Sequence, residues 1–568
     1  MKTNRLTAYL IWGALIFGTS ASAQQLTTRI RGEYADSIVI PATNPLPFTP
    51  ALPQTPAGGQ NYLSYSLQSL SVPVPASYGT LEPAAIADTL ATISSRGYAR
   101  LGLMSIFNVD ASAGYKIFDT DRTRLSAWLQ YDASAYRGSY SRDPGFGSRF
   151  VHNHAATIGA TLHQAVGRES FIDAGLDYTY GRNTVGAREA DNLYATDGRT
   201  TGRLNASALW TQRHRALDFG VGADYHYLHI ANPIFAVPNE NRVGGMAFIK
   251  GAFAGSSAAG LTATVSHQSF TSSVDRDADV FWSAPVSMSN TLLTLNPYYR
   301  LDLNKIHLDL GAKVNLTFGA GTVFHIAPDV KAVWVPASVL KIYGSATGGV
   351  RQNTLSSMLD AAPYLTPSAG ARPSNIPFEV TVGATVGSWH GLYANIFASY
   401  SQANDWLMPL QDPTAGYCSF SPLNLKGCLL HLGAGYSFKD IATVEAYLEK
   451  APGKQTRGYY LWMDRATTVA GADLTVRPLR PLSVTVGWDF RSGRSVTTID
   501  ALSSATPATA ELRSLGTISK LRASASYAVT KKFTIEGSID NILNRSFMLP
   551  GLIPGQGITG LIGASYQF

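Results

Sequence analysis

Residues 531–547 read KKFTIEGSIDNILNRSF, and residues 558–568, where the given sequence stops, read ITGLIGASYQF. In both stretches apolar and polar side chains alternate, so each predicts a strand with one apolar and one polar face. The apolar face of the last strand consists of Ile562, Ala564, Tyr566 and Phe568. Such a strand, stopping on an aromatic residue, is typical of the closing strand of an outer-membrane β-barrel, which must seal the last sheet edge. A secreted β-protein that ends on a strand is the alternative.

The amino terminus has the three parts of a secretory signal peptide. Lys2 and Arg5 form a basic region, residues 6–18 are mostly apolar but too short to span a bilayer, and residues 21–23 form a small-x-small cleavage site. We therefore expect residues 1–23 to be removed. The lack of a cysteine directly after this site argues against a lipoprotein.

Charge and hydropathy exclude several classes of protein. Loss of Lys2 and Arg5 lowers the formal net charge from +7 to +5, and no concentrated basic stripe of the kind that binds nucleic acid is present. Charged residues make up only 15% of the chain and the mean hydropathy is +0.00, which is unusual for one soluble domain of this size. Beyond the signal no stretch approaches the roughly 18 consecutive apolar residues of a membrane-spanning helix. Apolar surface spread by alternation along strands explains both values.

The two cysteines, Cys418 and Cys428, lie in or beside a presumed loop. Their spacing and an oxidising compartment favour a local disulfide, with two reduced thiols as the alternative. A metal site would need further ligands, which the flanking sequence does not offer.

Residues 24–95 differ in pattern from residues 96–568. The first segment carries nine prolines, few charges and no sustained period, which predicts an extended periplasmic arm. From Gly97 onward the alternation continues to the last residue. It predicts an all-β transmembrane antiparallel barrel of about 22 strands, most of them long enough to cross a membrane at a tilt.

The connections between the predicted strands alternate in length. Every second connection is a tight turn, as at Val166-Gly167, Leu303-Asn304 and Pro481. The other connections, apart from short ones near 106 and 320, are the long stretches 135–150, 183–200, 230–242, 271–287, 352–375, 405–427, 451–464, 496–514 and 544–557. Long outer loops and short periplasmic turns are the outer-membrane pattern.

The two faces of the strands agree with this pattern. In residues 122–134, Leu125, Leu129 and Tyr131 share an apolar face, and Trp128 is the exception on the polar face. Lipid outside and a polar lumen inside explain both faces, and aromatic residues near the strand ends predict interfacial girdles.

The end of the penultimate predicted strand carries a short motif, Asp540, Asn541, Ile542, Leu543, Asn544 and Arg545. This motif, a Pro/Gly-rich loop and the terminal strand together resemble the C-terminal end of TonB-dependent outer-membrane receptors. The resemblance implies a barrel over residues 96–568, substrate uptake across the outer membrane and a TonB-type energising partner. The folded plug of those receptors does not fit into the short segment 24–95, so we expect it to be missing. Residues 36–40 look superficially like a TonB-contacting box, and an arm that packs in the barrel mouth is the alternative.

No nucleophile, phosphate or metal motif emerges from the sequence. The pairs His152/His154 and His226/His229 lie at predicted strand ends and are interpreted as rim histidines. We expect no catalytic residues, no cofactor and no metal, and hence not an enzyme. Arg494, at the start of a predicted loop, is a candidate for contact with lipopolysaccharide phosphate or for plain solvation.

Three functions stay open at this point for a protein of the cell outer membrane of a Gram-negative bacterium. The first is receptor-like transport of a substrate that the sequence does not identify. The second is a plugless structural subunit of an outer-membrane assembly or export complex, and the third is a passive porin. A lumen of this width needs filling, either by the arm, by outer loops such as 352–375 and 405–427, or by another outer-membrane subunit.

Overall fold

The computed structural model describes fourteen stretches of the chain. The expected signal peptide and nearly all of the expected arm lie outside them, so both stay predictions. The described residues are 95–104, 108–139, 148–187, 199–231, 239–253, 257–271, 287–319, 323–361, 372–411, 418–439, 441–451, 466–499, 510–549 and 553–568.

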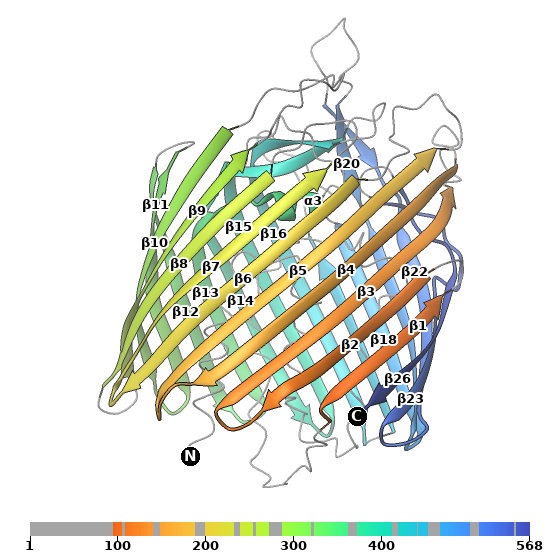
Figure 1. The fold of residues 1–568 in the computed structure, drawn as a ribbon, viewed down its shortest axis with the longest axis horizontal. Coiled ribbons are helices and arrows are strands. Elements are labelled where there is room, and N and C mark those ends of the chain that lie inside the picture. Colours follow the sequence, from red (N-terminus) through yellow and green to blue (C-terminus); the bar gives the residue numbers. More distant parts are fainter. Residues whose placement is uncertain are drawn as a thin grey trace, which may run out of the picture.

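Within these residues 22 strands form one closed ring (Figure 1). The large sheet has 24 strands, but β20 (Ser495–Ile499) and β21 (Ala510–Ser514) form a hairpin outside the ring. Ring neighbours pair antiparallel in sequence order, β19 pairs with β22, and β26 returns to β1. The predicted antiparallel barrel is confirmed.

The strands of the ring are β1 (Gly97–Met104), β2 (Asn108–Asp119), β3 (Thr123–Ser139), β4 (Ser148–Ala165), β5 (Ser170–Ala187), β6 (Arg199–His214), β7 (Leu217–Ala231), β8 (Asn239–Ala252), β9 (Ser257–Thr271), β10 (Ser287–Asp302), β11 (Ile306–Phe318), β12 (Val323–Ala337), β13 (Leu340–Arg351), β14 (Ser374–Trp389), β15 (Leu392–Gln411), β16 (Cys418–Phe438), β17 (Ala442–Lys450), β18 (Thr468–Leu479), β19 (Leu482–Ser492), β22 (Ile518–Ala528), β23 (Phe533–Asp540) and β26 (Thr559–Gln567).

The apolar half of the strands faces outward, as the alternation predicts. Leu129 is 50% exposed and Tyr131 37%, and Ile562 on the last strand reaches 75%. In water such exposure would be costly, but on a membrane barrel these side chains contact lipid. Trp128 lies on the opposite face, where its ring covers Gly159 on the neighbouring strand β4.

The short turns that follow every second strand, beginning with the one after β2, lie at one end of the barrel, the end where Figure 1 places the C-terminus. Several use a non-glycine residue in the left-handed region: φ is +55° at Arg215, +50° at His390 and +48° at Lys439. A tight reversal between long strands imposes this conformation, and the pairing on either side offsets its cost of about 1 kcal/mol. The predicted alternation of short and long connections is therefore confirmed.

Four of the predicted long loops contain regular structure that the sequence pattern did not reveal. Residues 352–375 include the helix α3 (Leu355–Ala361), and 496–514 hold the β20–β21 hairpin. Residues 544–557 hold the small hairpin of β24 (Met548–Leu549) and β25 (Ile553–Pro554). The largest difference is that β15 and β16 take up most of 405–427, beyond a β-bulge that interrupts the period of two.

Candidate functional site in the barrel lumen

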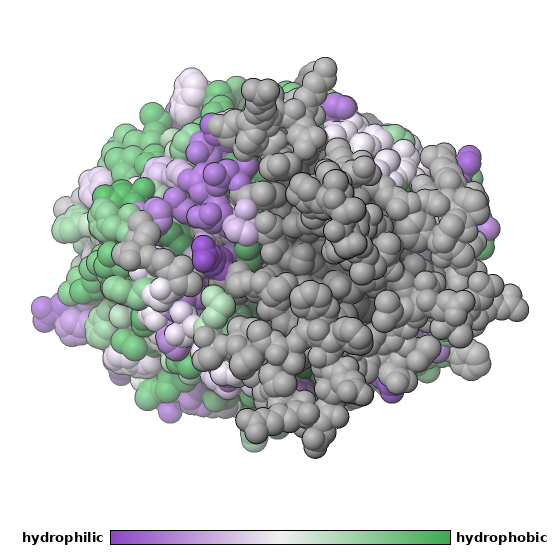
Figure 2. All heavy atoms as spheres, turned by 90° about the horizontal axis from the view of Figure 1, so that it is seen from above, coloured by the Kyte–Doolittle hydropathy of each residue, from purple (hydrophilic) through white to green (hydrophobic). Residues whose placement is uncertain are grey.

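The inner face of the ring is polar, and its charges pair across strands. Arg300 Nε on β10 lies 2.6 Å from Asp309 Oδ1 on β11. Asn296 on β10 donates to Asp329 Oδ2 on β12 at 2.8 Å, across the strand between them. Figure 2 shows the barrel from its outer end. Among the coloured atoms, most of the outside is hydrophobic, and hydrophilic residues gather closer to the centre of the opening. A wall of this kind faces water rather than lipid.

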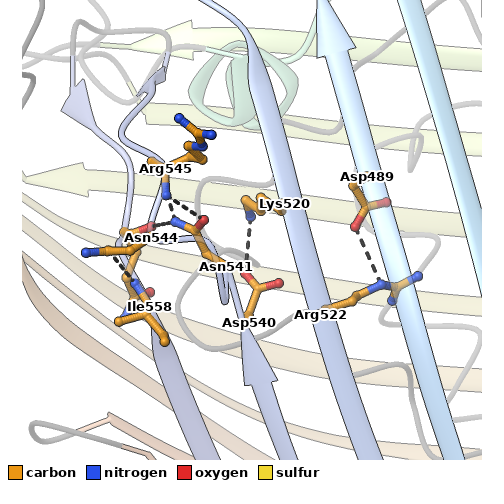
Figure 3. A network of polar contacts seen from close by, with 9 residues as sticks. Asp489, Lys520, Arg522, Asp540, Asn541, Asn544, Arg545 and Ile558 are labelled. Atoms are coloured by element: carbon orange, nitrogen blue, oxygen red, sulfur yellow. Dashed lines mark hydrogen bonds and ion pairs between the residues drawn. The ribbon is translucent and has the colours of Figure 1, made fainter.

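The predicted motif 540–545 forms the turn that ends β23. Asn541 and Asn544 both have a φ of +47°, a left-handed conformation that asparagine tolerates better than most residues. The fully buried Asn541 side chain donates to the carbonyl oxygens of Arg545 and Gln556, both at 3.1 Å, and accepts from the Arg545 backbone N–H at 3.0 Å. Asn544 Oδ1 accepts from the backbone N–H directly before β26 (Figure 3). These contacts place the two asparagines in a turn that positions the closing strand.

Asn541→Ala is expected to destabilise the barrel by about 2–4 kcal/mol, because the carbonyls of Arg545 and the buried Gln556 lose their donor and alanine is strained at this φ. The measurement is the denaturant midpoint of the detergent-folded protein. Leu543→Ala in the same turn is the matched control, since Leu543 is half exposed and makes none of these hydrogen bonds. Equal losses for both variants would contradict the role given to Asn541.

Next to this turn, five charged side chains from four strands form a network on the inner wall. Lys520 Nζ on β22 lies 3.3 Å from Asp540 Oδ2 on β23. Arg522 on β22 donates to both carboxylate oxygens of Asp473 on β18, at 2.6 and 2.8 Å, and its Nε lies 3.5 Å from Asp489 on β19 (Figure 3). Arg522 reaches Asp473 across β19, where a glycine leaves the space. The network therefore links β18, β19, β22 and β23 on the luminal side of the barrel.

A second network of ion pairs lies where the ring closes, at the junction of β1 and β26. Arg100 on β1 lies 2.7 Å from Asp110 on β2 and 2.5 Å from Glu536 on β23. The contact to Glu536 crosses β26 at Gly563, where a Cβ atom would come within 2.8 Å of Glu536 Oε1 and 3.0 Å of the Leu101 carbonyl oxygen. Because Gly563 has no side chain, Arg100 on β1 can reach across β26 to Glu536 on β23 while it also contacts Asp110 on β2.

At the outer end of the lumen, the segment after β13 folds onto the inner wall. The buried Glu240 on β8 accepts from the Leu355 backbone N–H at the start of α3 and from Gln268 Nε2 on β9, both at 2.6 Å. Gln352 donates to Asn290 Oδ1 on β10 at 2.9 Å, and Asn290 donates to Gln268 at 3.2 Å. The described part of this outer segment is thus held by three neighbouring strands.

Asn353 connects the same segment to β14 and, through it, to β15. Its amide donates to Ser374 Oγ on β14 at 2.8 Å, and Ser374 in turn donates to the carbonyl oxygen of Asp405 on β15 at 2.9 Å. The Arg351 guanidinium lies 5.0 Å from the centre of the Trp406 ring, a cation–π contact between β13 and β15. The α3 segment and the outer part of β15 therefore share one set of contacts.

The outer part of the β15–β16 hairpin leans across the mouth. The register shifts between Ala403 and Trp406, and Asp405 between them has a φ of +53°. Such a bulge bends a strand. Beyond it, Leu410 pairs in parallel with Thr497 of β20, although four strands separate β15 from β20 along the wall. The hairpin thereby covers part of the outer opening (Figure 1).

The predicted disulfide between Cys418 and Cys428 is wrong. Both residues lie on the single strand β16, and Cys428 is a free, exposed thiol. Ten residues of extended strand span about 33 Å, whereas a disulfide needs Cα atoms within about 7 Å. The prediction failed because the segment between the cysteines is a strand and not a loop.

The remaining predicted site residues have different structural roles. Ile562, Tyr566 and Phe568 face outward, and the Phe568 carbonyl oxygen accepts from the backbone N–H of Gly97 at 2.9 Å, which joins the two ends of the ring. Their role as an assembly signal stays a prediction. Arg494 is 4% exposed and donates to the Met548 carbonyl oxygen at 2.7 Å, so the expected lipopolysaccharide contact or solvation at this arginine is corrected.

The histidine pairs singled out in the sequence divide between the two faces. His226 is buried on the inner wall, with Nδ1 2.5 Å from Asn205 Oδ1, whereas His154 and His229 face outward. In the described part of the chain no group of three or more histidine, cysteine, aspartate or glutamate side chains is placed to hold a metal ion. Among these described residues, no helix has the length and hydropathy to cross a membrane.

No family model matches the sequence, and neither does any curated protein sequence. Solved structures do match. The ferric enterobactin receptor PfeA of Pseudomonas aeruginosa has a TM-score of 0.63 at 11% identity, with 84% of this chain and 81% of PfeA covered. The FrpB iron transporter of Neisseria meningitidis has a TM-score of 0.61 at 13% identity, with 83% and 81% covered. FpvA of Pseudomonas aeruginosa, bound to pyoverdine and iron, has a TM-score of 0.60 at 12% identity, with 84% and 72% covered.

These matches are TonB-dependent receptors, and at such low identity they establish a shared fold. The resemblance that the C-terminal motif indicated is therefore confirmed for the barrel. A plug is not evident among the described residues. The chain is a β-barrel of the cell outer membrane.

Proposed function

We propose that this chain takes up a substrate across the outer membrane in the manner of a receptor, by binding it at the outer mouth and passing it through the lumen. The observation that carries the proposal is the narrowed mouth. The α3 segment is fixed to the inner wall through Glu240, and the β15–β16 hairpin lies over part of the opening. A passive porin would instead need an unobstructed path for water and small solutes.

The shared fold supports the class of substrate and partner. The similar structures are a ferric enterobactin receptor, an iron transporter and a receptor bound to a pyoverdine and iron. We therefore propose an iron chelate as the substrate and a TonB-type protein as the energising partner. Residues 24–95, the segment that precedes the barrel, would fill the lumen and make contact with that partner.

Single-channel conductance of the purified mature chain in planar bilayers tests this proposal. The comparison is with a variant that lacks residues 24–90. We expect the mature chain to stay closed and the deletion to raise conductance by roughly ten-fold or more, because a barrel of this width is a water-filled channel when nothing fills it. Ferric chelate binding to the mature chain, followed by quenching of tryptophan fluorescence, is the second readout.

Two outcomes would contradict the proposal. A mature chain that conducts freely and binds no chelate would be a passive porin. If both forms stay closed and neither binds a chelate, the barrel is filled by its loops or by another subunit, and the scaffold function is the better account.

A further inference from the structure

The inner wall carries a group of aromatic side chains on neighbouring strands, in the half of the barrel next to the short turns. We call this group the aromatic wall, and its members are Tyr343 on β13, Tyr393 and Phe397 on β15, and His431 on β16. Phe397 stacks on His431 with 4.6 Å between the ring centres. Tyr343 and Phe397 face the lumen yet are only 6% and 8% exposed, so this apolar surface has little contact with water. In a water-filled lumen such a surface costs free energy unless something covers it.

The two tyrosines are held against the wall. Each lies directly opposite a glycine of the next strand, Gly383 for Tyr343 and Gly435 for Tyr393. A Cβ atom on either glycine would come within 2.5 Å of the tyrosine ring, so each ring fills the space above its glycine. The Tyr343 hydroxyl donates to Asn395 at 3.0 Å, and the Tyr393 hydroxyl donates to a carboxylate of β17 at 2.5 Å. Rings fixed in this way form a surface that can bind a partner without further ordering.

The strands beneath these rings carry few charges. In β14, β15 and β16 the residue types Asp, Glu, Lys and Arg occur as Glu379, Asp405 and Lys426. Asp405 lies in the bulge and Lys426 faces outward, so Glu379 is the charge that remains on the inner wall of these three strands. Further charges begin on either side, with Lys341 on β13 and Glu445 on β17.

Other inward-facing rings of the described barrel lie among charged side chains. Tyr98 on β1 covers a glycine of β2, but Arg100 and Asp110 form an ion pair on the same two strands. Tyr298 on β10 covers a glycine of β9, and Arg300, two residues further on, pairs with an aspartate of β11. An apolar, uncharged partner is therefore expected to prefer the aromatic wall, because it would leave buried charges without water elsewhere.

A segment of this chain has the matching chemistry. Residues 37–81 contain no aspartate, glutamate, lysine, arginine or histidine. They precede β1, which begins at Gly97 beside Phe568, at the end of the barrel that carries the short turns (Figure 1). Tyr343 and Tyr393 lie within the first four residues of β13 and β15, at that same end. The segment therefore joins the barrel at the end where the aromatic wall lies.

Prolines in this segment recur with a period of three, at positions 47, 50, 53 and 56. A polyproline II helix has three residues per turn, so these prolines would share one of its faces. Each residue of that helix rises about 3.1 Å, which spaces the prolines about 9.3 Å apart. On the wall, Tyr343 and Phe397 lie in one row two strands apart, a distance of about 9.6 Å. Successive prolines can therefore meet successive rings.

We propose that residues 47–56 dock on the aromatic wall as a polyproline II helix, and so hold the segment before the barrel against one side of the lumen. Aromatic-lined surfaces bind proline-rich helices because such a helix is already ordered when it binds. The inference rests on the proposed function, in which residues 24–95 fill the lumen, and it adds the surface that receives them.

Light-induced cross-linking of the full mature chain in proteoliposomes tests the docking site. Thr385→benzoylphenylalanine places a photoreactive group on β14, beside Asn395 and within the aromatic wall. The matched control is Ser126→benzoylphenylalanine on β3, half the ring of 22 strands away. We expect peptides that contain residues 47–56 to cross-link to position 385 roughly five-fold more than to position 126. Mass spectrometry of the digested protein measures both yields.

Two proline variants test the role of the row. The first is Pro47→Ala/Pro50→Ala/Pro53→Ala/Pro56→Ala, which is expected to lower the yield at position 385 by roughly five-fold or more, because it removes the face that meets the rings. The control is Pro73→Ala/Pro75→Ala/Pro83→Ala, outside the row, with an expected change of less than roughly two-fold.

One substitution on each wall tests the rings. Tyr393→Leu is expected to lower the yield at position 385 by roughly three-fold, because one ring of the surface is lost. Tyr98→Leu is the matched control, since it also removes a ring from above a glycine, but on β1. Its expected effect is less than roughly two-fold. Heat-modifiable migration of every variant establishes that the barrel is folded in each case.

The outcomes separate this inference from the proposed function. If residues 47–56 cross-link equally to positions 385 and 126, or if each variant and its control lose the same yield, the docking site is overturned. A mature chain that stays closed to ions but cross-links these residues at position 126 alone overturns the docking site and leaves uptake standing. A mature chain that conducts freely and cross-links at neither position overturns both.

Discussion

Arg100→Ala is expected to lower the free energy of unfolding of the barrel by about 3–5 kcal/mol, because it leaves two buried carboxylates without their cation. The Arg100 side chain is 6% exposed, and those of Asp110 and Glu536 are 13% and 7% exposed. Without the guanidinium, the two carboxylates face the same space across β1 and β26. The measurement is the denaturant midpoint of the detergent-folded barrel, followed by tryptophan fluorescence.

The control for this variant is Lys116→Ala. Lys116 makes an ion pair with Asp119 at 3.2 Å, but Asp119 is 43% exposed, so the loss is expected to stay below about 1 kcal/mol. A triple variant that adds Asp110→Asn and Glu536→Gln to Arg100→Ala is expected to recover part of the stability, because it removes the unpaired charges. A loss at Arg100 no larger than at Lys116 would show that the seam network does not hold the ring.

Glu240→Ala is expected to release the α3 segment from the inner wall. The substitution removes the acceptor of the Leu355 N–H and of the Gln268 amide, both buried groups. A loss of about 2–3 kcal/mol in docking corresponds to a roughly 30- to 150-fold rise in amide exchange. Hydrogen–deuterium exchange of peptides that cover residues 354–361 measures this rise.

Glu449→Ala is the matched control for the release of α3. Glu449 is also an inner-wall carboxylate with a hydrogen-bonded partner, His431 at 3.1 Å, but it lies on β17 and its side chain is 31% exposed. Exchange in residues 354–361 is expected to be unchanged in this variant. Equal exchange in the wild type and in Glu240→Ala would mean that other contacts, such as those of Asn353, hold the segment.

The barrel could be predicted from the sequence because its determinants are local. A period of two appears in single strands such as 482–492, and turn length is visible between neighbouring strands. The same alternation predicted that Leu129 and Tyr131 face outward. The predicted C-terminal motif pointed to a receptor-like barrel for the same reason, since its two asparagines hold a turn between consecutive strands.

The lumen contacts could not be predicted because they join residues far apart in the sequence. Glu240 and Leu355 are 115 positions apart, and nothing near either one marks it as a partner of the other. The ion pair of Arg100 and Glu536 spans 436 positions and depends on a glycine in a third segment. The bulge at Asp405 interrupts the alternation, so the outer parts of β15 and β16 were predicted to be a loop. The disulfide prediction was wrong because it assumed that loop.

The pairing of β1 with β26 has a consequence for how the barrel is made. Tyr98 pairs with Gln567, so the bonds that complete the ring join the first and last strands of the barrel. Contacts between such distant segments form slowly, because the chain must lose most of its freedom before they are gained. Until then both strands present unpaired edges that invite aggregation. We therefore expect the edges of β1 and β26 to stay unpaired and prone to aggregation until β26 has been synthesised and the two strands have met.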